Sequence, residues 1–228
     1  MGALLTGLSC VLLAGCRDAG RRSQAPQTGG GRQADRGQDA PAEERPVILF
    51  LGTSLTAGLG VESDSAYPAV LQRRLDSLGL RWRVINGGVS GETSAGLLRR
   101  LPWQLQGPIG IAFVETGAND GLRGLDVDST RANLDAIIRE VRAHDSTTRI
   151  VVVGMQAPPN MGPRFTRQFG ALFPDLARRD RLALLPFLLT GVAGVDSLNQ
   201  ADGIHPTPAG HRLVADNVWQ VLGPMVAR

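Results

Sequence analysis

Short runs of apolar residues alternate with longer amphipathic stretches along the chain from Pro46 onward. Five of these runs are almost wholly apolar, which is the pattern of strands that helices cover on both faces of a sheet. The predicted strands are Val47–Leu51, Trp82–Ile85, Ile109–Glu115, Arg149–Met155 and Leu182–Phe187. Because each is followed by a stretch of helical character, the pattern predicts a parallel sheet built from five β-α units.

Helical periodicity follows each of these runs. Between 129 and 143 the apolar residues recur at i, i+3 and i+4 positions, as they do on one face of an amphipathic helix. The predicted helices are Ala66–Leu78, Thr93–Gln104, Ser129–Ala143, Phe165–Arg179 and Pro208–Met225. We therefore expect residues 46–228 to form one α/β domain, a three-layer α/β/α sandwich with a doubly wound five-stranded parallel sheet.

The amino-terminal sequence has a different character. Residues 1–16, MGALLTGLSCVLLAGC, form an apolar stretch that is short for a membrane span and typical of the hydrophobic region of a secretory signal. Its last four residues, Leu-Ala-Gly-Cys, resemble the bacterial lipobox, in which the cysteine is lipidated and becomes the first residue of the mature protein. No lysine or arginine precedes the run, which departs from an ordinary signal. The expectation is a lipid anchor on Cys16.

Residues 17–45 are rich in Gly, Gln, Ala, Pro and charged residues and contain no apolar side chain larger than Ala or Pro. Such a segment cannot bury a core and is expected to be a flexible tether. A lipid anchor followed by a tether would hold the domain at a membrane surface, on the periplasmic side of a bacterial envelope.

The composition excludes some functions. The formal net charge is +3 and every basic side chain is an arginine, since the sequence contains no lysine. Aromatic residues make up only 4% of the chain, with no basic cluster beside them, so no nucleic-acid partner is expected. If Cys16 is lipidated, the mature protein has no other cysteine, and therefore no disulfide and no thiol nucleophile.

The first predicted strand ends in the turn Gly52-Thr53-Ser54, which leads straight into helix-like sequence. In a parallel α/β domain such a turn lies at the carboxyl end of the sheet, where ligands bind. The Ser54 hydroxyl would lie at the amino end of a helix, where free N–H groups favour developing negative charge. The simpler interpretation is that Ser54 only caps that helix.

Two further loops follow the second and third strands. The glycine-rich loop at 86–94 lets the backbone approach a ligand closely, but it lacks the GxGxxG pattern and the lysine of a phosphate-binding loop. After the third strand, Asn119 in Asn-Asp-Gly is either an ordinary turn residue or an amide that donates to an oxyanion. Strands one and three are expected to be neighbours, so Asn119 and Ser54 would then converge.

Near the end of the chain, Asp202 precedes His205 by three residues on a glycine-containing loop. This spacing allows the carboxylate to accept from one ring nitrogen, while the other nitrogen faces outward as a base. His144 ends a predicted helix and is expected to be a solvent-facing cation. His211 lies in the first turns of the last helix and is expected to be a surface or packing residue.

Taken together, these segments resemble those of the GDSL-type SGNH hydrolases over residues 46–228. The resemblance makes Ser54 of GTSLTAG the nucleophile, with its own N–H as an oxyanion donor. Gly91 of SGETS and Asn119 of GAND would supply the other two donors, and Asp202 and His205 of DGIH would complete the triad. The surrounding segments ETGANDGLRGL, MQAPPNMG and LLPFLL are similar to those of the periplasmic thioesterase and arylesterase branch.

This resemblance implies a flavodoxin-like fold and a serine esterase acting on short-to-medium acyl esters or thioesters, with no cofactor and no metal. It disfavours the ordinary α/β-hydrolases, because no G-x-S-x-G pentapeptide occurs. Thr53 stands where the family usually has Asp, and we expect this difference to alter hydrogen bonding around the turn without removing the chemistry.

Two other functions are considered. One is a carbohydrate O-deacetylase with the same machinery, and the other is a catalytically silent binding lipoprotein of the envelope that keeps the fold. The segment 158–173, which contains Met161 and three phenylalanines, either lines an acyl-chain site or packs a helix on the sheet.

Overall fold

The computed structural model describes residues 45–227. The predicted signal segment, its lipobox cysteine Cys16 and all but the last residue of the tether lie outside the described residues. From Arg45 onward strands and helices alternate, as the hydrophobic pattern predicts.

The five expected strands pair side by side in one parallel sheet, in the order β2-β1-β3-β4-β5. This is the doubly wound order, in which successive strands are added first on one side of β1 and then, from β3 onward, on its other side. The strands are β1 (Val47–Gly52), β2 (Arg83–Gly88), β3 (Ile109–Val114), β4 (Arg149–Val153) and β5 (Ala183–Leu185). The structure thus confirms the predicted α/β fold and the expected pairing of the first and third strands.

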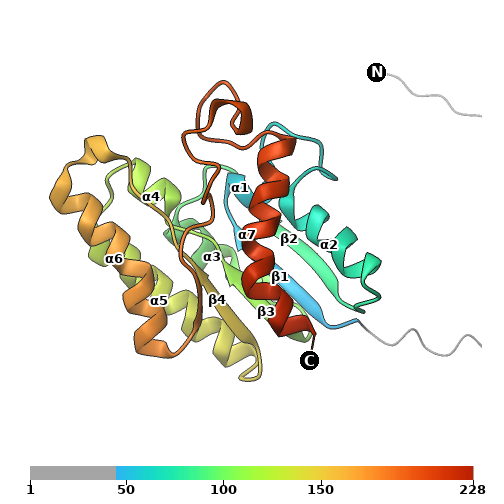
Figure 1. The fold of residues 1–228 in the computed structure, drawn as a ribbon. Helices are drawn as coiled ribbons and strands as arrows, with labels where there is room; N and C mark the ends of the chain where they lie inside the picture. The colour runs from blue at the N-terminus through green and yellow to red at the C-terminus, as the bar shows by residue number, and fades with distance from the viewer. Residues whose placement is uncertain (1–44, 228) are drawn as a thin grey trace, which may run out of the picture. The chain divides into compact units, whose positions relative to one another are not determined.

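Helices cover both faces of the sheet (Figure 1). The five longer helices are α2 (Tyr67–Ser77), α3 (Ser94–Gln104), α5 (Val127–His144), α6 (Pro163–Asp180) and α7 (Pro208–Val226). α2 packs on α7 at one face, whereas α3 packs on α5 and α5 on α6 at the other. The short helices are α1 (Ser54–Ala57) and α4 (Ala118–Leu122), with 3-10 turns η1 (Pro159–Met161) and η2 (Asp196–Leu198).

Three strands end earlier than the apolar runs predict. β3 stops at Val114, although the Glu115 amide still donates to the Leu51 carbonyl at 2.7 Å. β4 stops at Val153, where Gly154 follows. β5 ends at Leu185 because the next residue, Pro186, has no N–H with which to continue the ladder.

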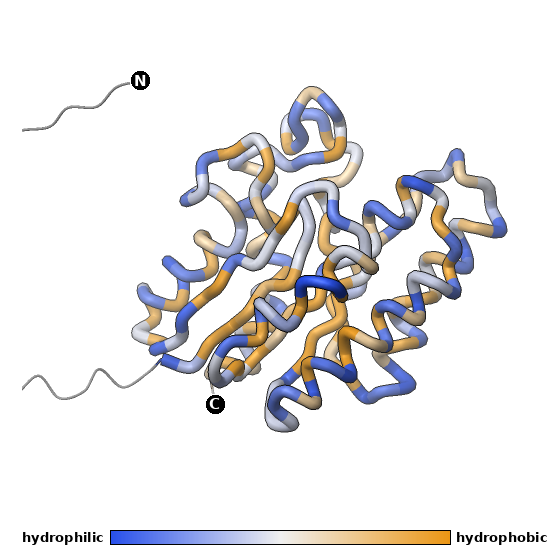
Figure 2. The backbone as a smooth tube through the Cα atoms, turned by 180° about the vertical axis from the view of Figure 1, so that it is seen from behind, coloured by the Kyte–Doolittle hydropathy of each residue, from blue (hydrophilic) through white to orange (hydrophobic). Residues whose placement is uncertain are grey.

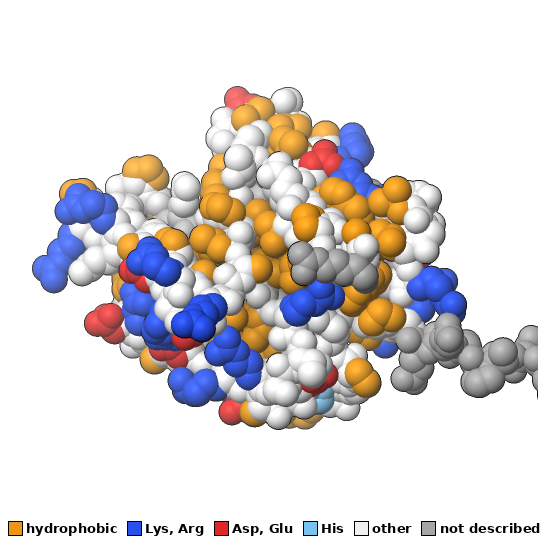
Figure 3. Space-filling view, turned by 60° about the horizontal axis from the view of Figure 1, so that its bottom comes forward, with side chains coloured by type: hydrophobic (Ala, Val, Ile, Leu, Met, Phe, Trp, Pro, Cys, Tyr) orange, Lys and Arg blue, Asp and Glu red, His pale blue; other side chains and the backbone are white. Residues whose placement is uncertain are grey.

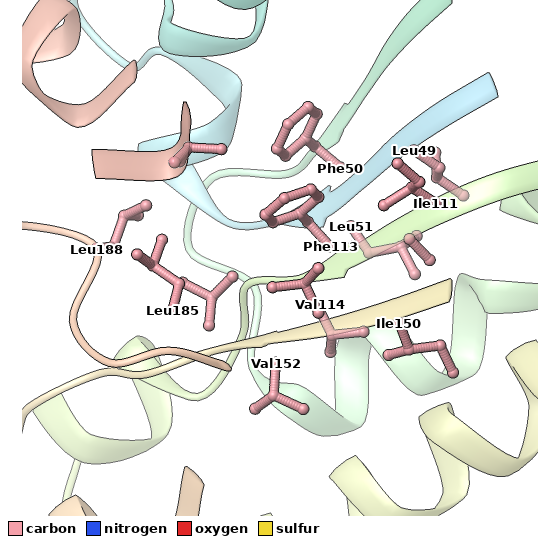
Figure 4. Packing of buried hydrophobic residues seen from close by; sticks show 14 of the residues in the cluster. Leu49, Phe50, Leu51, Ile111, Phe113, Val114, Ile150, Val152, Leu185 and Leu188 are labelled. Carbon is pink, nitrogen blue, oxygen red and sulfur yellow. The ribbon is translucent and has the colours of Figure 1, made fainter. Parts of the chain in front are cut away.

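The core lies on both sides of the sheet. Hydropathy along the chain shows the strands as apolar segments in the interior, with polar positions recurring along the helices (Figure 2). On the α2 and α7 side, Phe50 stacks on Phe113 with ring centroids 4.7 Å apart and meets Tyr67 edge-on at 5.4 Å. Aliphatic side chains of β1, β3 and β4, among them Leu51, Val114 and Val152, belong to the same buried cluster (Figure 4).

The amphipathic character of α5 is as predicted. Its residues Leu134, Ile137, Ile138 and Val141 are buried, and Ala132 is exposed. The helix begins after Asp126, whose carboxylate accepts from the Ser129 N–H at 2.8 Å. Such a cap satisfies one of the free amides at a helix start.

Arginine and acidic side chains lie close together on the face shown in Figure 3. Among the ion pairs of the domain, Arg179 contacts Asp135 and Asp180 at 2.6 and 2.7 Å. Within residues 45–227, none of the helices is long and apolar enough to cross a membrane.

Candidate active site

The nucleophile turn, defined here as residues Gly52–Thr56, lies at the carboxyl end of β1, beside the point where the sheet order reverses. Thr53 is the N-cap of α1 and Ser54 is its first residue. The interpretation of Ser54 as an N-cap is therefore wrong. Its hydroxyl oxygen instead lies 2.9 Å from Nε2 of His205, which is 151 residues further along the chain.

Asp202 holds His205 through the ring nitrogen Nδ1 and through the backbone N–H. The ring Nδ1 lies 2.6 Å from Oδ2 of Asp202, while Oδ1 accepts from the backbone N–H of His205 at 3.0 Å and of Ile204 at 2.9 Å. The hydrogen bonds from the His205 side chain and then from these two amides lower the pKa of Asp202 well below its usual range. An ionised Asp202 keeps the proton on Nδ1, so Nε2 is free to accept the proton of Ser54.

The loop that carries this pair is tied to the body of the domain. Asn199 and Pro206 form an antiparallel bridge across it, and the Gln200 N–H donates to the His205 carbonyl at 2.7 Å. The Gln200 side chain also donates to the Leu59 carbonyl at 2.7 Å, just beyond α1. These bonds join the loop of His205 to the segment that follows Ser54.

Gly91 and Asn119 are brought to the same edge of the sheet. Gly91 has φ of 76°, a conformation that L side chains rarely adopt, and its carbonyl accepts from Arg123 at 2.9 Å. Within the described chain its N–H has no hydrogen-bond partner. Asn119 donates one amide hydrogen to the Glu92 carbonyl at 3.0 Å, which leaves the second amide hydrogen of Nδ2 available.

Asn119 belongs to α4 rather than to an open turn. The neighbouring Asp120 is buried, and its carboxylate accepts from the Ser94 N–H at 2.8 Å and the Ser94 hydroxyl at 2.5 Å. The Thr130 hydroxyl, on α5, donates to the same carboxylate at 3.3 Å. Asp120 thus fixes α4 against α3 and α5, and with it the direction of Asn119.

Sequence reasoning missed Arg100, on α3. Its guanidinium forms a bidentate pair with Glu92, with Nε 2.8 Å from both carboxylate oxygens, and both side chains are largely buried. It also donates to the Gly87 carbonyl at 2.8 Å and the Gly52 carbonyl at 3.3 Å. One side chain therefore links the nucleophile turn to the loop of Gly91.

Glu115 was also missed, although it stands at the end of an otherwise apolar strand. That carboxylate is fully buried, and it accepts hydrogen bonds from Thr53 and Thr56. A charged residue that closes a buried strand was the available sequence signal. Thr53 contacts Glu115 through both its backbone N–H and its hydroxyl.

An apolar cavity of about 330 Å³ opens beside the nucleophile turn. Three of its lining residues, Leu55, Ala118 and Ile204, are the chain neighbours of Ser54, Asn119 and His205. Other parts of its wall come from the segments after β4 and β5. The remaining lining residues are Leu122, Met155, Gln156, Ala157, Pro158, Pro159, Phe187, Leu189, Ala193 and Gly203.

The segment 158–173 lies partly at the apolar cavity and partly in the core. Pro158 and Pro159 line the apolar cavity, whereas Phe169 and Phe173 are fully buried and pack α6 on the sheet. Phe165 stacks on Phe169 at 5.9 Å. For the two inner phenylalanines the packing interpretation is therefore correct.

The other two histidines lie apart from this chemistry. His211 is a packing residue, buried beside Tyr67, whose backbone N–H donates to its Nδ1 at 3.3 Å. Burial, together with the nearby His205, lowers the pKa of His211 to about 4, so it stays neutral. His144 is exposed at the end of α5, where Nε2 lies 2.8 Å from the Gly107 carbonyl. Residues 45–227 contain no group of three His, Cys, Asp or Glu side chains placed to hold a metal ion.

Comparisons with known proteins identify the family of this chain. The profile of the GDSL-like Lipase/Acylhydrolase family matches residues 50–213. The chain is 39% identical to "Esterase TesA" of Pseudomonas aeruginosa over 79% of this chain and 89% of that protein. It is 35% identical to "Thioesterase 1/protease 1/lysophospholipase L1" of Escherichia coli K12 over 79% and 85% of the two chains.

Solved structures give the same relationship. The crystal structure of the psychrotrophic esterase EstA from Pseudoalteromonas sp. superimposes with a TM-score of 0.75 at 31% identity, covering 80% of this chain and 99% of that one. On sequence and fold together, the chain belongs to the GDSL-like lipase/acylhydrolase family of SGNH hydrolases and is a GDSL-type carboxylic ester hydrolase.

Proposed function

We propose that Ser54 is the nucleophile of this hydrolase, His205 its general base and Asp202 the residue that orients the base. The observation that carries this proposal is the continuous path from the Ser54 hydroxyl through the His205 ring to Asp202, with contacts of 2.9 and 2.6 Å. A nucleophile within hydrogen-bond reach of a base, itself oriented by a third group, is the arrangement that acyl transfer requires.

In the first half of the reaction His205 Nε2 takes the Ser54 proton as Oγ attacks the ester carbonyl. The carbonyl π electrons move to the oxygen, which becomes an oxyanion. When the tetrahedral intermediate collapses, the carbon–oxygen bond to the leaving alcohol breaks and His205 donates its proton to that alcohol. The product at this stage is an acyl group on Ser54.

The oxyanion is assigned three donors, the N–H groups of Ser54 and Gly91 and the free amide hydrogen of Asn119. The Asn119 bond to the Glu92 carbonyl supports this assignment, because it turns the amide nitrogen rather than its oxygen toward the site. One such donor contributes about 2.7–4 kcal/mol to transition-state stabilisation in a serine hydrolase.

In the second half water replaces the alcohol. His205 takes a proton from the water, the hydroxide attacks the acyl carbon, and the tetrahedral intermediate expels Ser54, which recovers its proton from His205. The products are the carboxylic acid and the free enzyme. Asp202 remains ionised throughout and stabilises the imidazolium form of His205.

The apolar cavity is the proposed acyl site. A volume of about 330 Å³ lies at the small end of the range for ligand pockets, which favours short-to-medium acyl chains. Its apolar lining suits the acyl part and makes no demand on the leaving group, in keeping with esters and thioesters alike. The names of the relatives, an esterase and a thioesterase/lysophospholipase, belong to the same substrate class.

The two alternatives receive less support. A carbohydrate O-deacetylase would favour exposed aromatic side chains beside the site, yet Trp82, Trp103 and Trp219 are absent from the lining of the cavity. Trp103, the most exposed, lies in the last turn of α3, away from the helix start that faces the site. A silent binding protein has no need of the hydrogen-bonded Ser54, His205 and Asp202.

The test is hydrolysis of p-nitrophenyl esters from acetate to palmitate by residues 46–228 and by the Ser54→Ala variant. We expect turnover to be greatest for short or medium chains and to fall to background in the variant, with unchanged far-UV circular dichroism. Full activity in a folded Ser54→Ala variant would rule out Ser54 as the nucleophile.

The cavity itself predicts a change in chain-length preference. Ala157 is half-buried in its wall, so Ala157→Phe should fill part of it and shift the optimum toward acetate, lowering kcat/KM for octanoate at least tenfold. The matched control is Ala132→Phe on the exposed face of α5. An unchanged ratio of octanoate to acetate activity in Ala157→Phe would place the acyl chain elsewhere.

We also propose that the protein is exported and anchored through a lipid on Cys16, with residues 17–45 as the tether to the hydrolase domain. The lipobox-like end of the apolar segment supports this proposal. In a bacterial host, the full-length chain should fractionate with membranes and Cys16→Ser should release the activity from them. Equal membrane association of the full-length chain and the Cys16→Ser variant would contradict the proposed lipid anchor on Cys16.

A further inference from the structure

The proposed mechanism leaves one buried titratable group unused. Glu115 follows β3 and has no exposed surface. Its Oε2 accepts from the Thr53 N–H at 2.8 Å and from the Thr56 hydroxyl at 2.7 Å, and its Oε1 accepts from the Thr53 hydroxyl at 2.9 Å. The carboxyl group is therefore hydrogen-bonded to the nucleophile turn on both sides of Ser54.

The fit around this carboxyl group is close. A Cβ at Gly52 would lie 2.0 Å from Oγ1 of Thr56 and 2.6 Å from Oε2 of Glu115. Only glycine leaves room for the turn to fold over the carboxyl group at this position. Tyr67, on α2, lengthens the network, since its hydroxyl lies 2.6 Å from the Thr56 hydroxyl.

The network is anchored in the sheet rather than in a loop. The Glu115 backbone N–H donates to the Leu51 carbonyl at 2.7 Å, which extends the pairing of β1 with β3 beyond the last residue of β3. Movement of the Glu115 backbone relative to the turn would therefore require the two central strands to separate. A catalytic side chain needs such a rigid support to hold its productive geometry.

We propose that Glu115 is a positioning residue that sets the nucleophile turn, holding Thr53 and Thr56 so that the Ser54 hydroxyl faces His205. This inference rests on the proposed role of Ser54. It assigns Thr53 a function as well, because the threonine hydroxyl meets the second oxygen of the carboxyl group.

The role does not depend on the charge of Glu115. Burial raises the pKa of Glu115 to about 7, against which the hydrogen bonds from Thr53 and Thr56 act. When the group is protonated on Oε1, that oxygen donates to the Thr53 hydroxyl, while Oε2 still accepts from Thr53 and Thr56. A glutamine can reproduce this neutral arrangement, with its amide nitrogen in place of Oε1.

The experiment measures kcat and KM for p-nitrophenyl butyrate with four variants. Glu115→Gln should keep kcat within about threefold of the wild type at pH 8, since it can hold both threonines. Glu115→Ala should lower kcat about 100-fold and leave KM within twofold, because the turn is displaced while the acyl cavity is untouched. Thr53→Val, which keeps the shape but loses the hydroxyl, should lower kcat about tenfold, and Thr53→Ser should restore it.

The matched control is Thr148→Val. Thr148 is also a buried threonine, but its hydroxyl donates to the Ile109 carbonyl at 2.7 Å, at the opposite end of β3. This variant should lose stability without losing kcat. If Glu115→Ala fails to fold, the comparison of Thr53→Val with Thr148→Val decides alone, because both remove one buried hydroxyl.

Three results would overturn the inference: kcat of Thr53→Val equal to that of Thr148→Val, a rise in KM at constant kcat, or a loss of activity in Glu115→Gln as large as in Glu115→Ala. Failure of the proposed function can be distinguished from failure of this inference. Activity retained in Ser54→Ala would remove the nucleophile, whereas an inactive Ser54→Ala together with a fully active Thr53→Val would remove only the role of Glu115.

Discussion

Asn119 shows how a single side chain is prepared for its proposed role. One amide hydrogen is bonded to the Glu92 carbonyl, and the bonds of Asp120 hold the helix that carries it. The second amide hydrogen is therefore already directed before a substrate binds, so little reorganisation accompanies the reaction. The same holds for His205, whose ring is fixed by Asp202.

Asn119→Ala is expected to lower kcat by roughly 10²–10³ with little change in KM, since the missing hydrogen bond acts mainly on the oxyanion. Steady-state kinetics with p-nitrophenyl butyrate measures this loss. Gln72→Ala serves as a control, because Gln72 also donates its side-chain amide to a backbone carbonyl, that of Trp82 at 3.1 Å, from α2. Equal kcat in Asn119→Ala and in the control would exclude Asn119 from the oxyanion site.

The sequence indicated the residues proposed to carry the chemistry better than those proposed to support it. Ser54, Asp202 and His205 stand in short segments whose residue types already suggest acyl transfer. Glu115 and Arg100 carry no such signal, because their partners come from other strands and loops and become evident only when β1, β2 and β3 are side by side. Long-range contacts of this kind cannot be obtained from local patterns.

At the scale of elements, the site depends on loops from three parallel strands that meet at one edge of the sheet. Arg100 connects two of them, since it donates to the carbonyls of Gly52 and Gly87 and pairs with Glu92. Glu92 in turn follows Gly91 and accepts from Asn119 through its carbonyl. The Arg100 guanidinium thus contacts two of the three segments that supply the proposed oxyanion donors, and Glu92 connects it to the third.

Arg100→Lys tests this connection while keeping the charge. A lysine ammonium is a single point of donation and cannot reproduce the planar fork that reaches a carboxylate and two carbonyls at once. We expect kcat to fall about tenfold with KM nearly unchanged. Arg99→Lys, at the exposed neighbouring position of the same helix, is the control. Identical kinetics for the two variants would contradict a supporting role for Arg100.

Periodicity predicts whether each long element is a helix or a strand, whereas single residues decide where that element starts or ends. Pro186 ends β5 and Asp126 starts α5, as their chemistry dictates. A helix starting near Ser54 was expected without a predicted end, and α4 was not predicted, because four or five residues carry no helical period. Both hold proposed site residues, so the active site is the part of the fold that periodicity predicts least well.

At the scale of the whole molecule, burial of Glu115 ties stability to pH. Its pKa rises from 4.5 to about 7 on folding because burial disfavours the ionised form. The folded protein therefore binds this proton more tightly than the unfolded chain does. The resulting stability is fully present below pH 4.5 and is lost as the pH rises through 7.

Comparison of the wild type with Glu115→Gln isolates this effect, because all other titrating groups are shared. The free energy of unfolding of the wild type minus that of the variant should fall by roughly 3 kcal/mol between pH 4.5 and 8. Urea unfolding at a series of pH values measures the difference. A constant difference across this range would mean that Glu115 titrates alike in the folded and unfolded chains.

The most direct test of the account is covalent labelling of the folded protein with diethyl p-nitrophenyl phosphate, followed by peptide mass spectrometry. The account predicts that Ser54 attacks phosphorus and p-nitrophenolate leaves, so that one diethylphosphoryl group is found per chain, on the peptide containing Ser54. His205→Ala should label far more slowly, because no base removes the serine proton. A label on any other residue, or equal labelling rates in the two proteins, would contradict the assignment of Ser54 and His205 as nucleophile and base.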